Sequence, residues 1–435
     1  MDNSQYVKWF RHSSPYINAH RGKTFVLMLE GDAIADDNFA HIVQDIALLN
    51  SLGVRLVIVH GARPQIDQAL NVLNIKSQFH GDLRITDQAA LNAVRAAIGI
   101  VKSDIEARLS VGLPNTPMHG ARIRVVSGNF VTAKPKGVID GIDYQHTGEV
   151  RRIDRQAISQ QLDQGNIVLL SSCGYSPSGE MFNLAAEDVA THTATSLVAE
   201  KLILMGADEG LPSSANDAAT LSQITTDELS QLVEHLSGEQ KMHAQAALTA
   251  VKAGINRAHL LSYKIDGALL QELFTHEGAG TLITADEYEL LRQANIEDVG
   301  GILELLTPLE EEGVLVRRSR ELLETEINRF KVIERDGMII ACAALYPHSA
   351  EFAELACVAV STEYRSGQRG DRLLNAISAQ AKTESTPKIF VLTTRTAHWF
   401  IERGFSEAKI SALPQKRQSL YNFQRNSKIF IKKLD

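Results

Sequence analysis

Two short apolar runs that each end in glycine, with an amphipathic stretch between them, constrain the fold of this chain most. The runs are TFVLMLEG at 24–31 and VRLVIVHG at 54–61. Such runs are typical of strands buried on both faces, and the periodicity between them predicts a helix. Strand, helix and strand in this order form a right-handed parallel unit. The same order recurs at 155–174 and 188–210, which predicts an α/β fold, a three-layer α/β/α sandwich over about residues 20–284.

The sequence changes in character near residues 284–290. The stretch that follows is polar and is predicted to be rich in helix. Beyond it, Asp336-Gly337 lies between two β-rich runs, which is a strong hairpin signal. We therefore predict two domains, an α/β domain at 1–284 and an α+β domain at 290–435.

Composition excludes several classes of protein. Hydrophobic residues make up 44% and charged residues 22% of the 435 residues, as in globular proteins. The three cysteines, Cys173, Cys342 and Cys357, are too few and too widely spaced for a disulfide framework or a zinc site. We expect a cytoplasmic protein with no metal, no signal peptide and no membrane span. The net charge of −8 argues against a nucleic-acid partner.

The charge is distributed unevenly: acidic residues outnumber basic ones in 1–285 and in 286–360, whereas basic residues outnumber acidic ones in 361–435. There, the segment ELACVAVSTEYRSGQRGDRLLNAI at 354–377 runs from an apolar strand through an Arg- and Gly-rich turn into a helix that begins near Gly370. Free backbone amides and the helix dipole at such a turn suit a pyrophosphate. A solvated basic start of a helix would have the same pattern.

This segment resembles the acetyl-CoA loop of the GNAT acetyltransferases, whose pattern is Gln/Arg-x-x-Gly-x-Gly/Ala. Arg365 and Gly370 match its ends, whereas Gln368 replaces the middle glycine. TAHWFIERGF at 396–405 resembles the family's later helix that ends in Gly-Phe. The resemblance implies acetyl-CoA as co-substrate. The implied contacts are Cys357, Val358 and Val360 for the pantetheine and Arg365, Ser366, Gly367, Gln368, Arg369 and Gly370 for the phosphates.

Acetyl transfer to an amine needs a base and a proton donor. Glu354 lies on the strand just before the cofactor segment and is the candidate base, acting directly or through water; a surface carboxylate is the alternative. The tyrosine that usually serves as the acid in the family is replaced by Phe400, which has no proton to donate. The candidate acids that remain are a bound water and the side chains of Thr394, Thr396 and His398.

Arginines flank the predicted acetyl-CoA loop on both sides in the chain. Arg317 and Arg318 precede it, and Arg425 with Ser427 follows it. An arginine fork pairs with a carboxylate through two hydrogen bonds, so two such forks suit a dicarboxylic amino acid. Taken one by one, these arginines would more often be surface residues.

Four segments of the first domain resemble, in order, the motifs of the amino-acid kinase family, and N-acetylglutamate kinases most closely. They are VLMLEGDAIAD, LVIVHGARPQID, MFNLAAEDVA and AEKLILMGADEG. Met28 replaces the lysine of the kinases, and Glu30 replaces the first of two paired glycines. Ala62 and Arg63 replace glycines of the second loop. Phosphoryl transfer depends on such positioning and cationic groups, so we expect a catalytically inactive kinase fold.

The end of this domain resembles the arginine sensor of feedback-inhibited N-acetylglutamate kinases, in NRAHLLSY at 256–263 and LLQELFTHEGAGTLI at 269–283. The resemblance implies L-arginine as an allosteric ligand. Its implied contacts are Lys201, His259, Glu277, Gly278 and Gly280. SPYINAHRGKTF near the N-terminus resembles the extra helix of those enzymes, which implies a ring-like homo-oligomer such as a hexamer.

The order of the two domains resembles the family of bacterial N-acetylglutamate synthases nearly from end to end. That resemblance implies transfer of acetyl from acetyl-CoA to the amine of L-glutamate by direct attack. The reaction is the first step of arginine biosynthesis, with feedback inhibition by L-arginine. Two alternatives stay open: an active acylamino-acid kinase with an accessory domain, and an arginine-binding regulator whose acetyltransferase domain is inactive.

Overall fold

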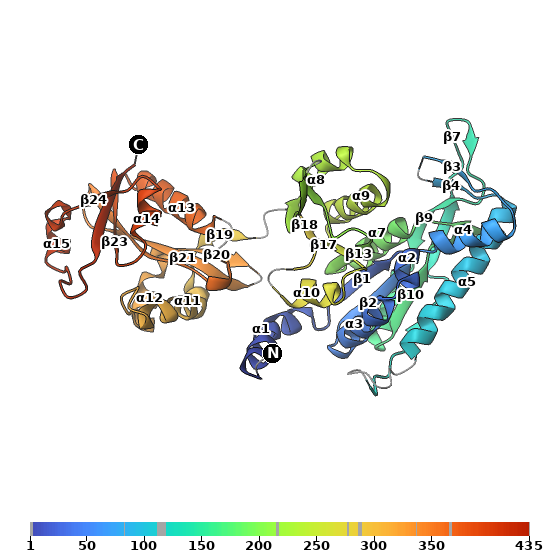
Figure 1. Ribbon diagram of the computed structural model, residues 1–435, viewed down its shortest axis with the longest axis horizontal. Coiled ribbons are helices and arrows are strands. Elements are labelled where there is room, and N and C mark those ends of the chain that lie inside the picture. The colour runs from blue at the N-terminus through green and yellow to red at the C-terminus, as the bar shows by residue number, and fades with distance from the viewer. Residues whose placement is uncertain are drawn as a thin grey trace. The chain divides into compact units, whose positions relative to one another are not determined.

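A computed structural model gives the fold of the chain as two compact units, Met1–Asp286 and Glu287–Asp435, which are described separately (Figure 1). The structure describes residues 3–81, 83–110, 119–214, 217–275, 278–285, 289–335, 337–364 and 368–434.

An eight-stranded sheet forms the centre of the N-terminal unit. Its strand order is β16 (Gln223–Thr225), β18 (Thr281–Thr284), β17 (Arg257–Ser262), β13 (Lys201–Gly206), β1 (Thr24–Leu29), β2 (Arg55–His60), β10 (Ile167–Ser171) and β5 (Val125–Val126). β1 pairs in parallel with both β2 and β13. The predicted strand–helix–strand unit is therefore present, with α3 (Phe39–Ser51) between β1 and β2.

Strand β1 contributes side chains to both faces of this sheet. Phe25, Leu27 and Leu29 are buried in one core, and Val26 and Met28 in the other. The helices that pack into the first core are α1 (Asn3–His20), α2 (Gly31–Ala35), α3, α4 (Arg63–Val72), α5 (Gln88–Ser110) and α10 (Ala268–Phe274). The helices of the second core are α6 (Arg155–Asp163), α7 (Ala186–Leu197), α8 (Thr226–Leu232) and α9 (Gly238–Lys252). The predicted three-layer sandwich is confirmed.

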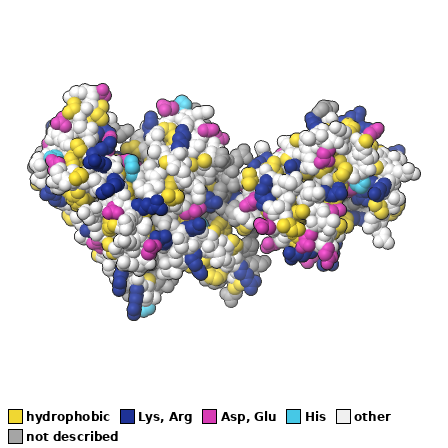
Figure 2. Space-filling model, turned by 180° about the vertical axis from the view of Figure 1, so that it is seen from behind, with side chains coloured by type: hydrophobic (Ala, Val, Ile, Leu, Met, Phe, Trp, Pro, Cys, Tyr) yellow, Lys and Arg dark blue, Asp and Glu magenta, His cyan; other side chains and the backbone are white. Residues whose placement is uncertain are grey.

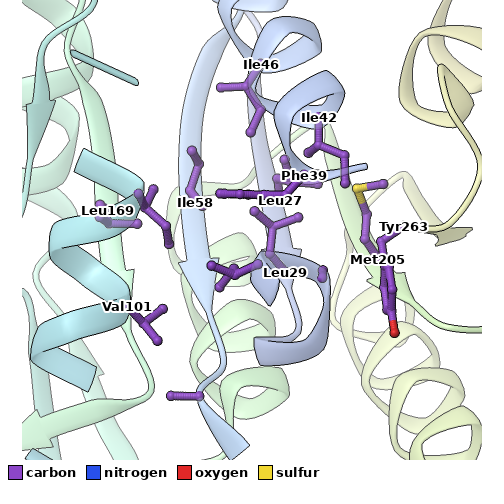
Figure 3. Packing of buried hydrophobic residues seen from close by; sticks show 14 of the residues in the cluster. Leu27, Leu29, Phe39, Ile42, Ile46, Ile58, Val101, Leu169, Met205 and Tyr263 are labelled. Atoms are coloured by element: carbon purple, nitrogen blue, oxygen red, sulfur yellow. The ribbon is translucent and has the colours of Figure 1, made fainter. Parts of the chain in front are cut away.

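Figure 3 shows side chains of the first core that come from several elements, among them Leu27 of β1, Phe39 of α3 and Val101 of α5. Burying one such side chain contributes about 1.5–3 kcal/mol to folding.

Shorter strands lie outside the central sheet. A four-stranded sheet has the order β12 (Met181–Asn183), β11 (Cys173–Tyr175), β6 (Val131–Pro135) and β9 (Gly148–Ile153). The two-stranded pairs are β3 (Gln78–His80) with β4 (Leu83–Ile85), β7 (Val138–Ile139) with β8 (Ile142–Asp143), and β14 (Pro212–Ser214) with β15 (Asp217–Thr220).

A seven-stranded mixed sheet forms the C-terminal unit. Its order is β19 (Leu290–Gln293), β20 (Phe330–Arg335), β21 (Met338–Pro347), β22 (Phe352–Val360), β23 (Lys388–Thr393), β25 (Lys428–Lys433) and β24 (Ser406–Ala408). The predicted hairpin joins β20 and β21, and Gly337 supplies the positive φ of +75° that its turn needs; Asp336 lies outside the described residues. The stretch predicted to be helix-rich begins instead with a strand, because β19 pairs with β20.

Helices cover both faces of this second sheet. One core contains α13 (Arg369–Thr383) and α14 (Ala397–Ile401), and the other contains α11 (Val299–Glu311) and α12 (Arg320–Glu326). The short α15 (Gln415–Gln418) lies in the connection between β24 and β25. The expected α+β domain is confirmed.

A bulge in β22 reverses which face its side chains occupy. Between Ala356 and Ala359, β22 has one residue more than the facing part of β21, and Cys357 has a φ of +52°. Before the bulge, Leu355 is buried in the core of α13; after it, Cys357 and Ala359 are buried in the core of α11. Leu355, Cys357 and Ala359 are each two positions apart, and in a regular strand they would share one face. The extra residue of the bulge accounts for the change of face.

β22 and β23 are parallel neighbours that separate soon after they meet. Phe352, Ala353 and Glu354 pair with 388–390. Within the described residues 355–360, β22 has no further pairing to β23. A wedge between the two strands therefore begins just after Glu354, with unpaired backbone along its wall.

None of the helices in the described part of the chain is long and apolar enough to span a membrane. On the face drawn in Figure 2, basic and acidic side chains are interspersed over each unit. The described cysteines, Cys173, Cys342 and Cys357, are all buried free thiols.

Candidate active site and regulatory site

Glu354 lies where β22 and β23 separate, and its carboxylate is held by an arginine and a histidine. Arg417 donates from Nε to Oε2 at 2.7 Å and from Nη2 to Oε1 at 3.1 Å. His348 Nε2 lies 3.1 Å from Oε2. His348 comes from the connection between β21 and β22, and Arg417 comes from α15. The predicted base is thus a buried and oriented carboxylate.

The surroundings of Glu354 determine its acidity. Burial by itself raises the pKa of this carboxyl group, but the hydrogen bonds from His348 and Arg417 outweigh burial and hold the pKa below its ordinary value. Glu354 is therefore ionised at neutral pH. Any weakening of the Arg417 contact would make the carboxylate more basic.

The structure brings together two of the arginines that lie on opposite sides of the loop in the sequence. Burial, together with the charge of Arg318, lowers the pKa of Arg425, so the two guanidinium groups lie within electrostatic reach of each other. The charge of Glu354 acts on Arg318 as well. Arg318 also lies over the ring of Tyr346, 5.7 Å from its centroid. Arg425 donates through Nη2 to the carbonyl of Val314, while its buried Nε has no hydrogen-bond partner among the described residues.

Other predicted residues lie differently. Arg317 is exposed on the segment before α12, and no described contact joins it to Glu354. Ser427 is buried, and its carbonyl accepts a hydrogen bond of 2.7 Å from Tyr421. Thr394 and His398 are exposed.

Thr396 belongs to a hydroxyl pair that the sequence did not reveal. Its Oγ1 lies 2.8 Å from Oγ1 of Thr393, the last residue of β23, and Thr393 is buried. The backbone amides of Arg395 and Thr396 donate to Thr393 Oγ1 as well. Thr393 thus places a hydroxyl on the strand that forms one wall of the wedge.

Only part of the predicted phosphate loop is described, because Arg365, Ser366 and Gly367 lie outside the described residues. Gln368 caps α13 with a φ of +56°. Gly370 lies in the first turn, and a Cβ there would meet the ring of Trp399 at 2.9 Å. This glycine therefore allows α14 to pack closely against the start of α13.

The side chain of Arg369 has a partner inside the unit. Its Nε donates to both carboxylate oxygens of Glu289 at 2.9 Å, and Arg372 and Arg335 approach the same carboxylate. Glu289 is buried. These contacts engage the Arg369 guanidinium with Glu289, so the expected phosphate contact in the described part of the turn falls to the backbone amides at 368–370.

In the N-terminal unit, His259 of β17 lies in the predicted arginine region. Its Nδ1 is 2.6 Å from Oε1 of Glu272, a carboxylate of α10 that the sequence analysis missed. Burial, with a contribution from Lys201, holds the pKa of His259 below its ordinary value. The neutral ring donates from Nδ1 to the carboxylate, so Nε2 is an acceptor. This buried Nε2 has no hydrogen-bond partner among the described residues.

The glycine segment of this region closes onto the same carboxylate. Ala279 donates its backbone amide to Glu272 Oε2 at 2.7 Å. A Cβ at Gly278, where φ is +72°, would meet this Oε2 at 2.6 Å, and a Cβ at Gly280 would meet the Leu260 carbonyl at 2.1 Å. Lys201 is buried at the start of β13, beside β17. Glu277, the remaining predicted contact, lies outside the described residues.

A cavity of about 350 Å³ is lined by residues of the loops that follow β1 and β2. Its lining includes Met28, Glu30, Ala62 and Arg63, the positions at which the sequence departs from the kinase motifs. Met28 is buried and uncharged, and Glu30 is a buried carboxylate. The loop after β1 therefore offers a carboxylate, and β1 offers no cationic side chain, where the resemblance to the kinases implies phosphate contacts.

Comparison with known families agrees with both units. The amino acid kinase family matches residues 23–262, and the acetyltransferase (GNAT) domain matches residues 326–407. The class of protein is therefore a kinase-like α/β unit joined to a GNAT acetyltransferase unit.

Relatives of full length narrow this class. Amino-acid acetyltransferases of Ectopseudomonas mendocina and Azotobacter vinelandii are 55% and 56% identical, and each alignment covers 99% of both chains. The N-acetylglutamate synthase of Neisseria gonorrhoeae complexed with coenzyme A and L-arginine is 37% identical, with 99% of both chains covered and a TM-score of 0.89. For that synthase complexed with coenzyme A and N-acetyl-glutamate, the identity and coverage are the same and the TM-score is 0.64. The chain belongs to the amino-acid acetyltransferase family, as its motifs predicted.

Proposed function

We propose that this chain transfers the acetyl group of acetyl-CoA to the α-amine of L-glutamate and that L-arginine inhibits it. The observation that carries the proposal is the position of Arg318 over the ring of Tyr346, the residue of β21 that pairs with Glu354, together with the charge interactions of Arg318 with Arg425 and Glu354. Two guanidinium groups suit the two carboxylates of glutamate, and a carboxylate suits its ammonium. The Neisseria gonorrhoeae synthase, complexed with coenzyme A and N-acetyl-glutamate, supports the same pair of ligands.

In the proposed reaction, the glutamate ammonium loses a proton to Glu354, directly or through water. The free amine then attacks the thioester carbonyl; a C–N bond forms, the C–S bond breaks, and the thiolate takes up a proton. Burial raises the pKa of the Cys357 thiol to about 12, so this thiol stays protonated and is a poor nucleophile. That favours direct attack over an acetylated cysteine.

The proton for the thiolate is the least defined step. Of the predicted donors, Thr396 is the one whose hydroxyl hydrogen-bonds to a buried hydroxyl. That hydroxyl belongs to Thr393, at the end of the strand that borders the wedge. We propose this hydroxyl pair as the route of the proton. The acetyl-CoA phosphates would bind the backbone amides of the turn at 365–370, and the pantetheine would bind the edge of β22 at Cys357, Val358 and Val360.

We further propose that the N-terminal unit is a catalytically inactive kinase fold that binds L-arginine at Lys201, His259, Glu277, Gly278 and Gly280. The unpartnered Nε2 of His259 supports this, because a guanidinium has only donors and a neutral imidazole nitrogen accepts one.

Helix α10 links this region to α1. Glu272 of α10 bonds His259, and the Leu273 carbonyl lies 2.7 Å from Nε2 of His20 in α1. If α1 assembles the chain into a ring-like homo-oligomer in the cytoplasm, arginine would act on that assembly through α10. Such coupling is typically about 1–3 kcal/mol.

The experiment that tests the proposal measures thiol release from acetyl-CoA by the full chain, with and without L-glutamate and L-arginine. We expect release that requires glutamate and falls when arginine is added. Thiol release that does not depend on glutamate would refute the substrate. Phosphorylation of acetylglutamate from ATP would refute the inactive kinase fold, and arginine binding without acetyl transfer would favour the regulator alternative.

A further inference from the structure

Three carboxylates converge in the cavity of the N-terminal unit. Glu30 follows β1, Asp32 lies in α2 and Glu239 lies in the first turn of α9. One oxygen of each lies within 4.8 Å of the others, and Glu30 and Glu239 both line the cavity. Carboxylates at this separation repel one another, and the charge of Glu30 acts on both of its neighbours.

The cationic groups nearby compensate this charge only in part. Arg63 Nη1 lies 4.0 Å from Glu239 Oε1, and its Nη2 lies 3.7 Å from another carboxylate, Glu187. His243 Nε2 lies 2.9 Å from Glu30 Oε1, but without the alignment of a full hydrogen bond. Lys264 acts on Asp32 only as a weaker, more distant charge.

A second observation points to a ligand. The Glu30 side chain is only 9% exposed, and its second oxygen, Oε2, is buried without a hydrogen-bond partner among the described residues. A buried carboxylate oxygen that receives neither a donor nor a cation costs about 1–3 kcal/mol or more. Glu30 lines the cavity, and one oxygen of its carboxylate lies within 4.8 Å of oxygens of Asp32 and Glu239, so a cation among the three carboxylates would supply the missing partner.

The spacing fits one metal ion. Two oxygens bound to the same Ca²⁺ lie at most about 5 Å apart, twice the usual Ca–O distance of about 2.3–2.6 Å. Carboxylate oxygens are also the ligands preferred by Mg²⁺ and Mn²⁺. We propose that Glu30, Asp32 and Glu239 form a binding site for a hard divalent cation. This site goes beyond the acetyl transfer and the arginine regulation proposed above, and it does not depend on either of them.

A larger charged ligand fits the cavity less well than an ion does. A zwitterion would need an anion-binding group opposite the three carboxylates. The lysines of the cavity, Lys134 and Lys136, are both paired with Glu149, at 3.2 and 2.8 Å. An ion with its remaining waters needs no such second group.

The proposed ion would join parts of the chain that are far apart in sequence. It would link the end of β1 and α2 to the start of α9. His243 of α9 is already seated beside Glu30, because Gly206 has no side chain there; a Cβ would meet the His243 ring at 2.8 Å. The ion would therefore occupy the region of the former phosphate site and stabilise the inactive kinase fold.

The test uses the full chain, stripped of metal with a chelator and titrated with Mn²⁺ while electron paramagnetic resonance reports the free ion. We expect one Mn²⁺ per chain, displaced by Ca²⁺ or Mg²⁺, and a rise of a few degrees in Tm at saturation. Glu30→Gln and Glu239→Gln should each raise the Kd for Mn²⁺ at least tenfold. Glu234→Gln removes a carboxylate from the exposed surface of the same unit, outside the cavity, and should leave that Kd unchanged.

Circular dichroism and glutamate-dependent thiol release show whether each variant is folded. If Glu30→Gln does not fold, the exposed Asp32→Asn carries the same test. Absence of stoichiometric Mn²⁺ binding, or equal binding by wild type and these variants, would overturn the proposal. So would a rise in Tm caused by methylammonium or guanidinium but by none of the three metals, since the ligand would then be an organic cation.

Discussion

Both units lead an apolar strand into a helix through a turn that contains glycine, yet they place opposite charges there. In the N-terminal unit, β1 is followed by Glu30 and then by α2, whose first residue is Gly31. In the C-terminal unit, the turn after β22 leads to Gln368, Arg369 and Gly370 at the start of α13. Backbone amides at a helix start favour an anion in either case. The charged side chains therefore decide which ligand is allowed.

Close packing explains both glycines, Gly31 and Gly370. A Cβ at Gly31 would meet Gln65 Oε1 at 2.4 Å and Pro64 Cδ at 2.8 Å. A Cβ at Gly370 would meet Trp399 at 2.9 Å. A glycine between a strand and a helix is thus required by close neighbours in both units, whether or not a phosphate binds there.

The largest effect on the comparison of the two units is expected from removing the Glu354 carboxylate of the C-terminal unit. Glu354→Gln should lower kcat by about 10²–10⁴-fold, because a general base typically contributes that much, while binding of acetyl-CoA is retained. Steady-state thiol release and a titration with CoA measure the two quantities. Glu351→Gln, an exposed change on the same connection, is the control. If Glu354→Gln turns over at the wild-type rate, Glu354 is not the base.

A basic residue of the same unit should affect substrate binding more than chemistry. Arg425→Ala should raise the KM for glutamate about 10–100-fold with a smaller change in kcat, because a charge-assisted hydrogen bond contributes about 1.5–3 kcal/mol. Kinetics at varied glutamate concentration measure this. Arg320→Ala, whose side chain is exposed and paired with Glu324, should change neither constant. An unchanged KM in Arg425→Ala would remove this residue from the substrate site.

In the N-terminal unit, a substitution should change regulation without changing turnover. His259→Ala removes the unpartnered Nε2 acceptor and should raise the arginine concentration for half-inhibition about tenfold or more. Uninhibited kcat should stay near that of wild type. His235→Ala, on the surface at the end of α8, is the matched control. Full inhibition of His259→Ala at wild-type arginine concentrations would contradict the placement of the site.

The smallest expected effect concerns stability and pH. Burial, with the charge of Asp266, raises the pKa of Asp45 in α3 to about 7. A carboxyl whose pKa is higher in the folded state stabilises the fold at low pH, and this stability is lost progressively as pH rises from the ordinary pKa of 3.8 to about 7. Asp45→Asn should therefore raise Tm by a few degrees at pH 8 relative to wild type, and by less at pH 5.5. Thermal denaturation at both values measures this, with the exposed Asp104→Asn as control; an equal shift at both values would refute it.

The sequence predicted the fold well because local patterns determine it. The apolar runs at 24–31 and 54–61 are β1 and β2, and the Asp336-Gly337 hairpin joins two strands. Residues 290–293 were predicted poorly, because their strand forms only by pairing with β20, about 40 residues further along. Such pairing is set by tertiary structure and has no local signal.

The candidate site was predictable where a motif marks it and not where distant side chains complete it. Glu354 was found from its position before the acetyl-CoA segment. Arg417, 63 residues away, holds its carboxylate and has no motif of its own. Likewise Glu272, which bonds His259, lies inside the segment that resembles the arginine sensor, yet only the structure shows the contact.

The alternation of side chains along β1 has a consequence for how this chain can vary. Because Leu27 and Met28 belong to different cores, inserting or deleting one residue in β1 would exchange the contents of the two cores. The same slip would carry Glu30 away from His243. Changes of length in this strand would thus damage packing and the cavity together, so we expect viable variants to change β1 by substitution and to confine insertions to the loops beyond it.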